Sequence, residues 1–169
     1  MNTAANIATD GSVVAGTTVT AGTGITATTG NIVASAGDLN AVGGHRKDYL
    51  WSQADCTASQ SAVAMAMHGG DAAITGVPMA RAGSITALTI QSENARSAGT
   101  CTVAVTKNGT ATAVTAVLNG TNTTKVTTAS AKDTVTFAAG DVIGCKVTTD
   151  GDWAAGSTPS LLADVEVEC

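Results

Sequence analysis

Residues 11–44 carry one branched aliphatic side chain every six or seven positions, and this spacing limits the possible folds more than any other feature of the chain. The residues concerned are Val13, Val19, Ile25, Ile32 and Leu39. Neither a helix, with a period of about 3.6 residues, nor a long strand, with a period of about 2, produces this pattern. The spacing predicts a repeat of short extended rungs, in which glycines let the backbone turn between one inward aliphatic and the next.

A single copy of the repeat cannot bury these side chains. Each fully buried aliphatic stabilises by about 1.5–3 kcal/mol, whereas ordering about thirty residues costs roughly 1–2 kcal/mol for each of them. The balance becomes favourable if identical chains wrap around a common axis. We therefore interpret residues 11–44 as an intertwined, β-helix-like shaft of a homotrimer, with Val13, Val19, Ile25, Ile32 and Leu39 on the trimer axis. A disordered linker is the alternative that composition alone allows.

Residues 1–10 precede the repeat and are small and mostly polar, with Ile7 as the one sizeable aliphatic after Met1. We expect an attachment segment that becomes ordered on a partner; a frayed end is the alternative. The segment lacks the basic start and apolar centre of a secretory signal, so we expect synthesis and assembly in a cytoplasm.

The composition favours β structure with a thin core. Hydrophobic residues make up 44% of the chain, but aromatic residues make up only 2%, so most apolar side chains are small. The net charge is −5, and Arg46-Lys47 is the one adjacent basic pair, which argues against nucleic-acid binding. No apolar run approaches the ~20 residues that a membrane-spanning helix needs, so we expect no membrane insertion.

The composition changes at Gly43-Gly44, where the repeat gives way to HRKDYLWSQADC. This change predicts a domain boundary, with a head domain over residues 45–169. Tyr49, Leu50 and Trp51 are predicted to form the shaft–head junction, because amphipathic rings suit such contacts. Ligand stacking on Trp51 is the alternative.

The head reads as an antiparallel β domain. Asn108-Gly109 is the residue pair that a type I′ hairpin turn prefers. The fold class that we predict is all-β, a β-sandwich with a jelly-roll-like strand order. Residues 69–83 are predicted to be a long connection. The expected strands cover residues 62–67, 85–92, 101–106, 110–118, 124–128, 134–137, 142–149 and 161–168.

Two of these strands have informative faces. In residues 85–92, strand alternation places Ile85 on the face opposite Leu88 and Ile90. In residues 161–168, one face is apolar and the other carries Asp164, Glu166 and Glu168. This acidic row is predicted to be a solvated outer face that discourages unwanted pairing. The alternative is a row of carboxylates that gathers a cation.

The four cysteines, Cys56, Cys101, Cys145 and Cys169, do not have metal-site spacing. In a cytoplasmic product they are expected to be free and mostly buried. Strand parity points both Cys101 and Cys145 into the core. They are therefore candidates to face each other across the sandwich and to oxidise later.

The sequence offers few groups for catalysis. His45 and His68 are 23 positions apart, and nothing places a nucleophile beside either of them. No phosphate-binding loop, nucleophile elbow or zinc-protease motif is present. We predict that the protein is not an enzyme and uses neither a cofactor nor a metal.

The segment GNIVASAGDLNAVGG, followed by a small β head, resembles bacteriophage fibre proteins. GSITALTIQSENARSAGTCTVAVTKNGT and TVTFAAGDVIGCKVTTD are similar to jelly-roll modules of phage fibres and capsid decorations. The resemblance implies a homotrimer on the virion surface, made in the host cytoplasm. Its N-terminus would dock on the major capsid protein or another virion protein, and its head would face outward.

Receptor-binding tips of this family often carry exposed aromatic residues or a bound metal, and this sequence clearly shows neither. A head fibre or capsid decoration, structural and weakly adhesive, is therefore the leading interpretation. The alternative is a short tail fibre or baseplate tip that binds a host surface glycan. A third interpretation is a bacterial surface or filament subunit.

Overall fold

The computed structural model describes residues 46–70, 73–157 and 159–169, which form eleven β-strands and no helix. None of these residues therefore belongs to a helix that could cross a membrane. The strands are β1 (Arg46–Gln53), β2 (Val63–Ala64), β3 (Ala66–Met67), β4 (Gly76–Pro78), β5 (Gly83–Ser92), β6 (Cys101–Lys107), β7 (Thr110–Leu118), β8 (Lys125–Ala129), β9 (Thr136–Phe137), β10 (Val142–Thr149) and β11 (Leu161–Glu168).

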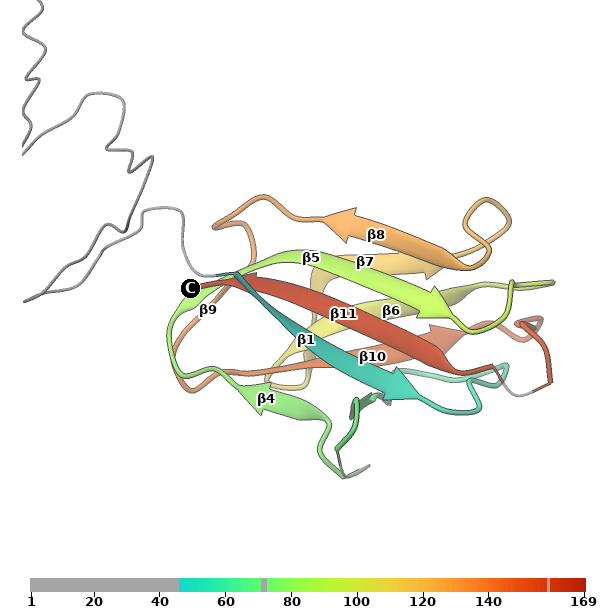
Figure 1. The fold of residues 1–169 in the computed structure, drawn as a ribbon, viewed down its shortest axis with the longest axis horizontal. Helices are drawn as coiled ribbons and strands as arrows, with labels where there is room; N and C mark the ends of the chain where they lie inside the picture. Colours follow the sequence, from blue (N-terminus) through green and yellow to red (C-terminus); the bar gives the residue numbers. More distant parts are fainter. Residues whose placement is uncertain (1–45, 71–72, 158) are drawn as a thin grey trace, which may run out of the picture. The chain divides into compact units, whose positions relative to one another are not determined.

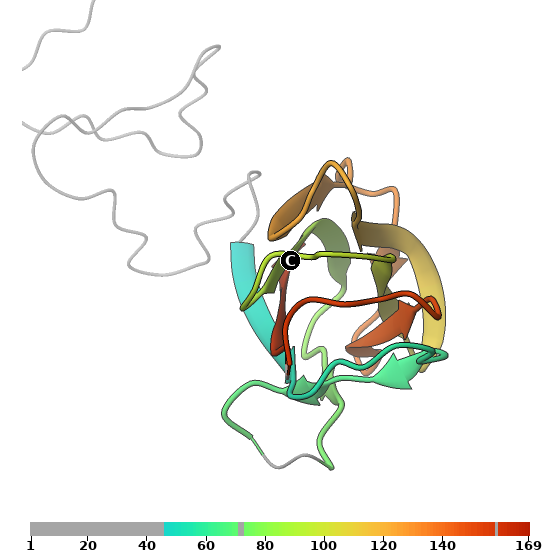
Figure 2. The same ribbon diagram turned by 90° about the vertical axis from the view of Figure 1, so that its right-hand side faces the viewer.

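The strands form two antiparallel sheets (Figure 1). The first has the order β3-β1-β11-β5-β8, and β9 also pairs with β5. The second has the order β2-β10-β6-β7, and β4 also pairs with β10. Viewed end-on, the two sheets curve around a common interior (Figure 2).

The strand pairing is nested from the two ends of the domain inward. β1 pairs with β11, β2 and β4 pair with β10, β5 pairs with β8, and β6 pairs with β7, as in one long hairpin. This hairpin is wrapped so that β11 also meets β5 and β10 also meets β6. Such a double-sheet order is that of a jelly roll. The predicted all-β sandwich with a jelly-roll-like order is therefore found, whereas the shaft, the trimer axis and segment 1–10 lie outside the described residues.

Local sequence signals located several strands correctly. β7, β10 and β11 have the predicted bounds, because clear apolar alternation begins after a turn signal in each of them. Asn108 and Gly109 have φ values of 52° and 79°, as the predicted type I′ turn requires.

Two regions differ from the prediction. Residues 46–53, where no strand was predicted, form β1, which pairs with β11 along its whole length and contains Tyr49, Leu50 and Trp51. The single strand expected over residues 62–67 is divided, because β2 pairs with β10 in one sheet and β3 pairs with β1 in the other. Met65 lies between them and is fully buried. Within the expected connection 69–83, a short strand β4 pairs with β10.

A β-bulge in β5 corrects the predicted faces of that strand. Glu166 pairs with Ala87 and Val167 pairs with Ile85, so Thr86 is the extra residue. The bulge reverses strand parity. Ile85 is consequently fully buried on the same side as Leu88 and Ile90, and its placement on the opposite face was wrong.

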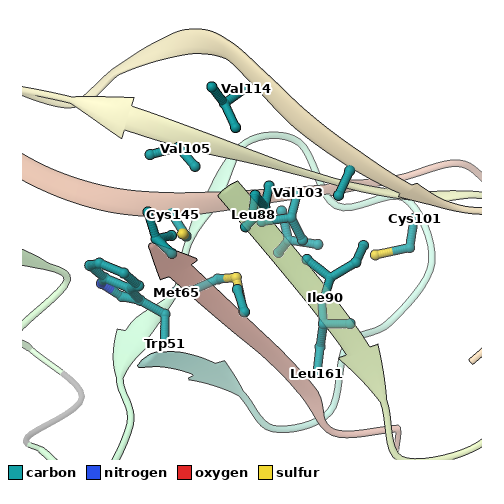
Figure 3. Packing of buried hydrophobic residues seen from close by; sticks show 14 of the residues in the cluster. Trp51, Met65, Leu88, Ile90, Cys101, Val103, Val105, Val114, Cys145 and Leu161 are labelled. Carbon is teal, nitrogen blue, oxygen red and sulfur yellow. The ribbon is translucent and has the colours of Figure 1, made fainter. Parts of the chain in front are cut away.

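The core lies between the two sheets and consists mainly of small and branched side chains (Figure 3). Trp51 is the largest fully buried residue, and it points into the same interior as Met65 and Cys145. The backbone N–H of Met65 donates to the Cys145 carbonyl oxygen at 2.9 Å, which holds this crossing segment against β10. Trp51, Phe137 and Trp153 are the buried aromatic residues of a core that is otherwise made of smaller side chains, in keeping with the low aromatic content of the sequence.

The cysteines are free, as expected, and three of the four are buried. Cys101 and Cys145 both face the core, but they do not face each other. Cys101 pairs in register with Thr149 and Cys145 with Val105, so the two thiols belong to neighbouring strands of one sheet. Four register positions along a strand correspond to about 13 Å. The alternative in which Cys101 and Cys145 face each other across the sandwich is therefore not found.

Candidate functional site

The three junction residues do not share one face of β1. Tyr49 and Trp51 point toward the interior, and their ring centroids are 6.3 Å apart. Leu50 points to the outer face, where its exposed fraction is 38%. Trp51 has no exposed surface, so no ligand can stack on it while the sandwich is closed. Contact between these residues and the shaft remains a prediction, because residues 11–44 are outside the described part of the chain.

The acidic row of β11 is not a solvated edge. β11 lies between β1 and β5, and Glu168 is only 5% exposed. The Glu168 carboxylate contacts Lys132 Nζ at 2.5 Å and Arg46 Nε at 3.7 Å. Glu166 contacts Arg46 Nη1 at 3.3 Å and accepts a hydrogen bond from Thr86 Oγ1 at 2.6 Å. The predicted outer face is found for Asp164 and Glu166, which are partly exposed, whereas Glu168 is buried and paired with Lys132 and Arg46. The predicted role of discouraging edge pairing was wrong, because β11 is not an edge strand.

The same arrangement does not form a cation site. Glu166 and Glu168 are both paired with the Arg46 guanidinium. Across residues 46–70, 73–157 and 159–169, no three His, Cys, Asp or Glu side chains are grouped so that they could hold a metal ion. His68 is exposed at the end of β3, and His45 lies outside the described residues.

Asp164 is the least compensated carboxyl group of this face. Its Oδ1 is buried and has no hydrogen-bond partner among the described residues. Burial raises the pKa of Asp164, and the neighbouring carboxylates of Asp48 and Glu166 raise it further. The folded state therefore binds this proton more tightly than the unfolded state. The resulting stability is present at pH values below the ordinary pKa of 3.8 and is lost as the pH rises through the raised pKa.

We predict that Asp164→Asn raises the thermal midpoint at pH 7 by about 2 °C, which corresponds to less than about 1 kcal/mol after solvent screening. The gain should disappear near pH 3.5, where the wild-type carboxyl group is protonated. Calorimetry at both pH values measures this difference, and an equal gain at both would contradict a charge effect.

Asp141→Asn is the matched control. Asp141 accepts hydrogen bonds from the Ala138 N–H at 2.8 Å and from Asn108 Nδ2 at 2.7 Å, and these bonds lower its pKa. Removing that charge should lower the midpoint at pH 7. Its effect therefore has the opposite sign to that of Asp164→Asn.

A cavity of ≈ 270 Å³ lies beside the first half of β1 and was not predicted. Its lining residues are Lys47, Tyr49, Met79, Ala80, Arg81 and Cys169. Lys47 Nζ is 5.1 Å from the centroid of the Tyr49 ring, a cation–π distance. An aromatic face with cations at its rim suits a ligand that has a flat apolar side and an anionic group. The sequence contained one signal for this cavity, the basic and aromatic run of β1. It contained none for Met79 and Arg81, because the pairing of β4 with β10 brings these residues to the cavity.

Comparisons with known proteins identify no family for this chain. No family model matches the chain, and no curated protein matches it. A chain in the solved structure "Cyanophage Pam1 capsid asymmetric unit" is similar over 82% of this chain and 93% of its own length. The identity is 17% and the TM-score is 0.45, so this likeness carries no inference about function.

Proposed function

We propose that the protein is a structural, non-catalytic component of a bacteriophage virion, a homotrimeric fibre or decoration on the capsid surface. One observation carries the proposal: the aliphatic repeat ends at Gly44 and the first strand of the jelly-roll-like head begins at Arg46. In the sequence, only His45 separates the last glycine of the repeat from β1. Such a succession suits a shaft that continues into a head.

The head is organised in a way that fits display at the end of a shaft. Arg46 of β1 pairs with Glu168 of β11, so the chain enters the head at the end where β11 finishes. The connections that follow β1, β5 and β10 lie at the other end of the same strands (Figure 1). In this proposal those connections face away from the capsid, and residues 1–10 dock on the major capsid protein or another virion protein.

Deleting residues 1–10 tests the proposal. Because these residues are assigned to attachment and residues 11–44 to assembly, the shortened protein should stay trimeric but no longer sediment with capsids that lack this protein. A variant with residues 1–10 in scrambled order is the matched control and should also fail to attach. Attachment retained after the deletion would refute the role of this segment, and a single-chain mass for the full protein would refute the trimer.

A short tail fibre or baseplate tip that binds a host surface glycan is the second candidate, because the cavity at Tyr49 combines a ring with two cations. In that case the isolated protein should bind host cells, and Tyr49→Ala should abolish the binding while the mass stays unchanged. A capsid decoration should instead bind capsids and should not bind host cells.

A further inference from the structure

Two buried thiols, those of Cys56 and Cys101, belong to the end of the sandwich opposite to Arg46. Cys56 lies in the connection after β1 and is 1% exposed, and Cys101 begins β6 and is fully buried. Both belong to the same core cluster. The sequence places them far apart, and no spacing motif connects them.

Backbone hydrogen bonds fix the segment around Cys56 against the strand beside Cys101. Cys101 pairs in register with Thr149 of β10. The N–H of Thr149 donates to the Gln60 carbonyl oxygen at 3.0 Å, and its hydroxyl donates to the Thr57 carbonyl oxygen at 2.7 Å. Residues 57–60 are therefore held at the residue that faces Cys101.

Cys56 itself is held from two further sides. Its N–H donates to the Pro159 carbonyl oxygen at 2.9 Å, and its carbonyl oxygen accepts from Trp153 Nε1 at 2.9 Å. Its sulfur lies 3.5 Å from Gln60 Oε1. These contacts fix the backbone of Cys56, and its thiol donates to the Gln60 side chain of the segment that Thr149 holds.

The two thiols are chemically unequal. A hydrogen bond from the Cys101 thiol lowers the pKa of Cys56, although burial opposes this effect. The same bond and burial raise the pKa of Cys101. Cys56 is therefore the thiol that ionises first, and the thiolate is the nucleophile in thiol oxidation.

We propose that Cys56 and Cys101 are a peroxide oxidation site that closes into an intramolecular disulfide. The Cys56 thiolate attacks one oxygen of hydrogen peroxide, the O–O bond breaks, and the hydroxide that leaves becomes water with the proton that Cys56 has lost. Cys56 is then a sulfenic acid. The Cys101 sulfur attacks the Cys56 sulfur, the S–O bond breaks, and hydroxide leaves as water with the Cys101 proton. Two thiols lose two electrons, and one peroxide becomes two waters.

The disulfide would tie the connection after β1 to the start of β6. It would close a loop of about 45 residues within the domain, which restricts the unfolded chain. The expected consequence is a rise of about 10 °C in the thermal midpoint. This inference stands on the head alone and does not depend on the proposed function.

The test uses the full chain with Cys169→Ser, because the exposed Cys169 would join molecules to one another. The native protein is treated with dilute hydrogen peroxide, and its intact mass and thermal midpoint are measured. We expect a mass about 2 Da lower and a thermal midpoint that rises and is restored by dithiothreitol. Before reduction, a digest should contain a disulfide-linked pair of peptides that carry Cys56 and Cys101. After denaturation one thiol, that of Cys145, should remain for alkylation.

Cys101→Ala and Cys145→Ala in the same background are the matched variants, since each removes one buried thiol. Cys145→Ala should still lose about 2 Da, and Cys101→Ala should not. If Cys101→Ala does not fold, the linked peptide pair and the number of free thiols in the Cys169→Ser protein show whether the Cys56–Cys101 disulfide has formed. An unchanged mass, oxygen addition without a cross-link, or a cross-link that includes Cys145 would overturn the proposal.

Discussion

Replacing Ile25 or Ile32 by aspartate should reduce the native mass from that of three chains to that of one. On the proposed trimer axis, each substitution brings three carboxylates together in an apolar environment. Burying an unpaired charge costs several kcal/mol or more, and like charges add to this cost. Sedimentation velocity measures the mass directly.

The head should remain folded in these variants, because its core residues all lie between Trp51 and Val167. A far-ultraviolet spectrum of β structure and an unchanged thermal transition of the head would demonstrate this. Asn31→Asp is the matched control, since it adds the same charge beside Ile32 at a position that is already polar. If Ile25→Asp and Ile32→Asp keep the wild-type mass, the trimer axis is misplaced.

Replacing Trp51 by alanine should cost about 3–5 kcal/mol of unfolding free energy, the range for deleting a large buried aromatic side chain. Trp51 is fully buried, and the surrounding core has few large side chains that could fill the space. Both neighbouring strands hold its backbone in place, because Trp51 pairs with Ala163 of β11 and with Met67 of β3. Collapse of the cavity is therefore restricted. Urea unfolding, followed by the fluorescence of the remaining Trp153, measures the loss.

Trp51→Phe is the informative control. The indole Nε1 of Trp51 is buried without a hydrogen-bond partner among the described residues. Phenylalanine removes this unsatisfied donor while it keeps a ring in the core, so we expect a loss of about 1–2 kcal/mol. A loss below about 1 kcal/mol for Trp51→Ala would mean that Trp51 does not support the core.

Strands with clear alternation between two turn signals were predictable. β7 and β10 are of this kind, because their turns are specified by local residues such as Asn108-Gly109, and β11 alternates clearly after the turn signal that precedes it. β1 was not predictable in the same way, since its sequence RKDYLWSQ is largely polar. It forms a strand because all eight of its residues pair with residues of β11, which lies beside it in the sheet.

The candidate site was less predictable than the fold. The acidic face of β11 could be derived from alternation, but its partners Arg46 and Lys132 come from a strand and a connection distant in the sequence. The cavity at Tyr49 depends in the same way on the segment after β4.

The sequence by itself determined the β class of the head, its small-residue core and the bounds of β7, β10 and β11, because these follow from period-2 patterns and turn residues. The strand order within the two sheets was decided by the tertiary structure. The tertiary structure alone decided which residues surround Cys56 and Cys101 and which cations pair with Glu166 and Glu168. It also decided that Ile85 lies on the buried face of β5, because of the bulge at Thr86. These depend on which strands lie side by side. Register between distant strands is fixed by packing of the whole domain, and no local pattern encodes it.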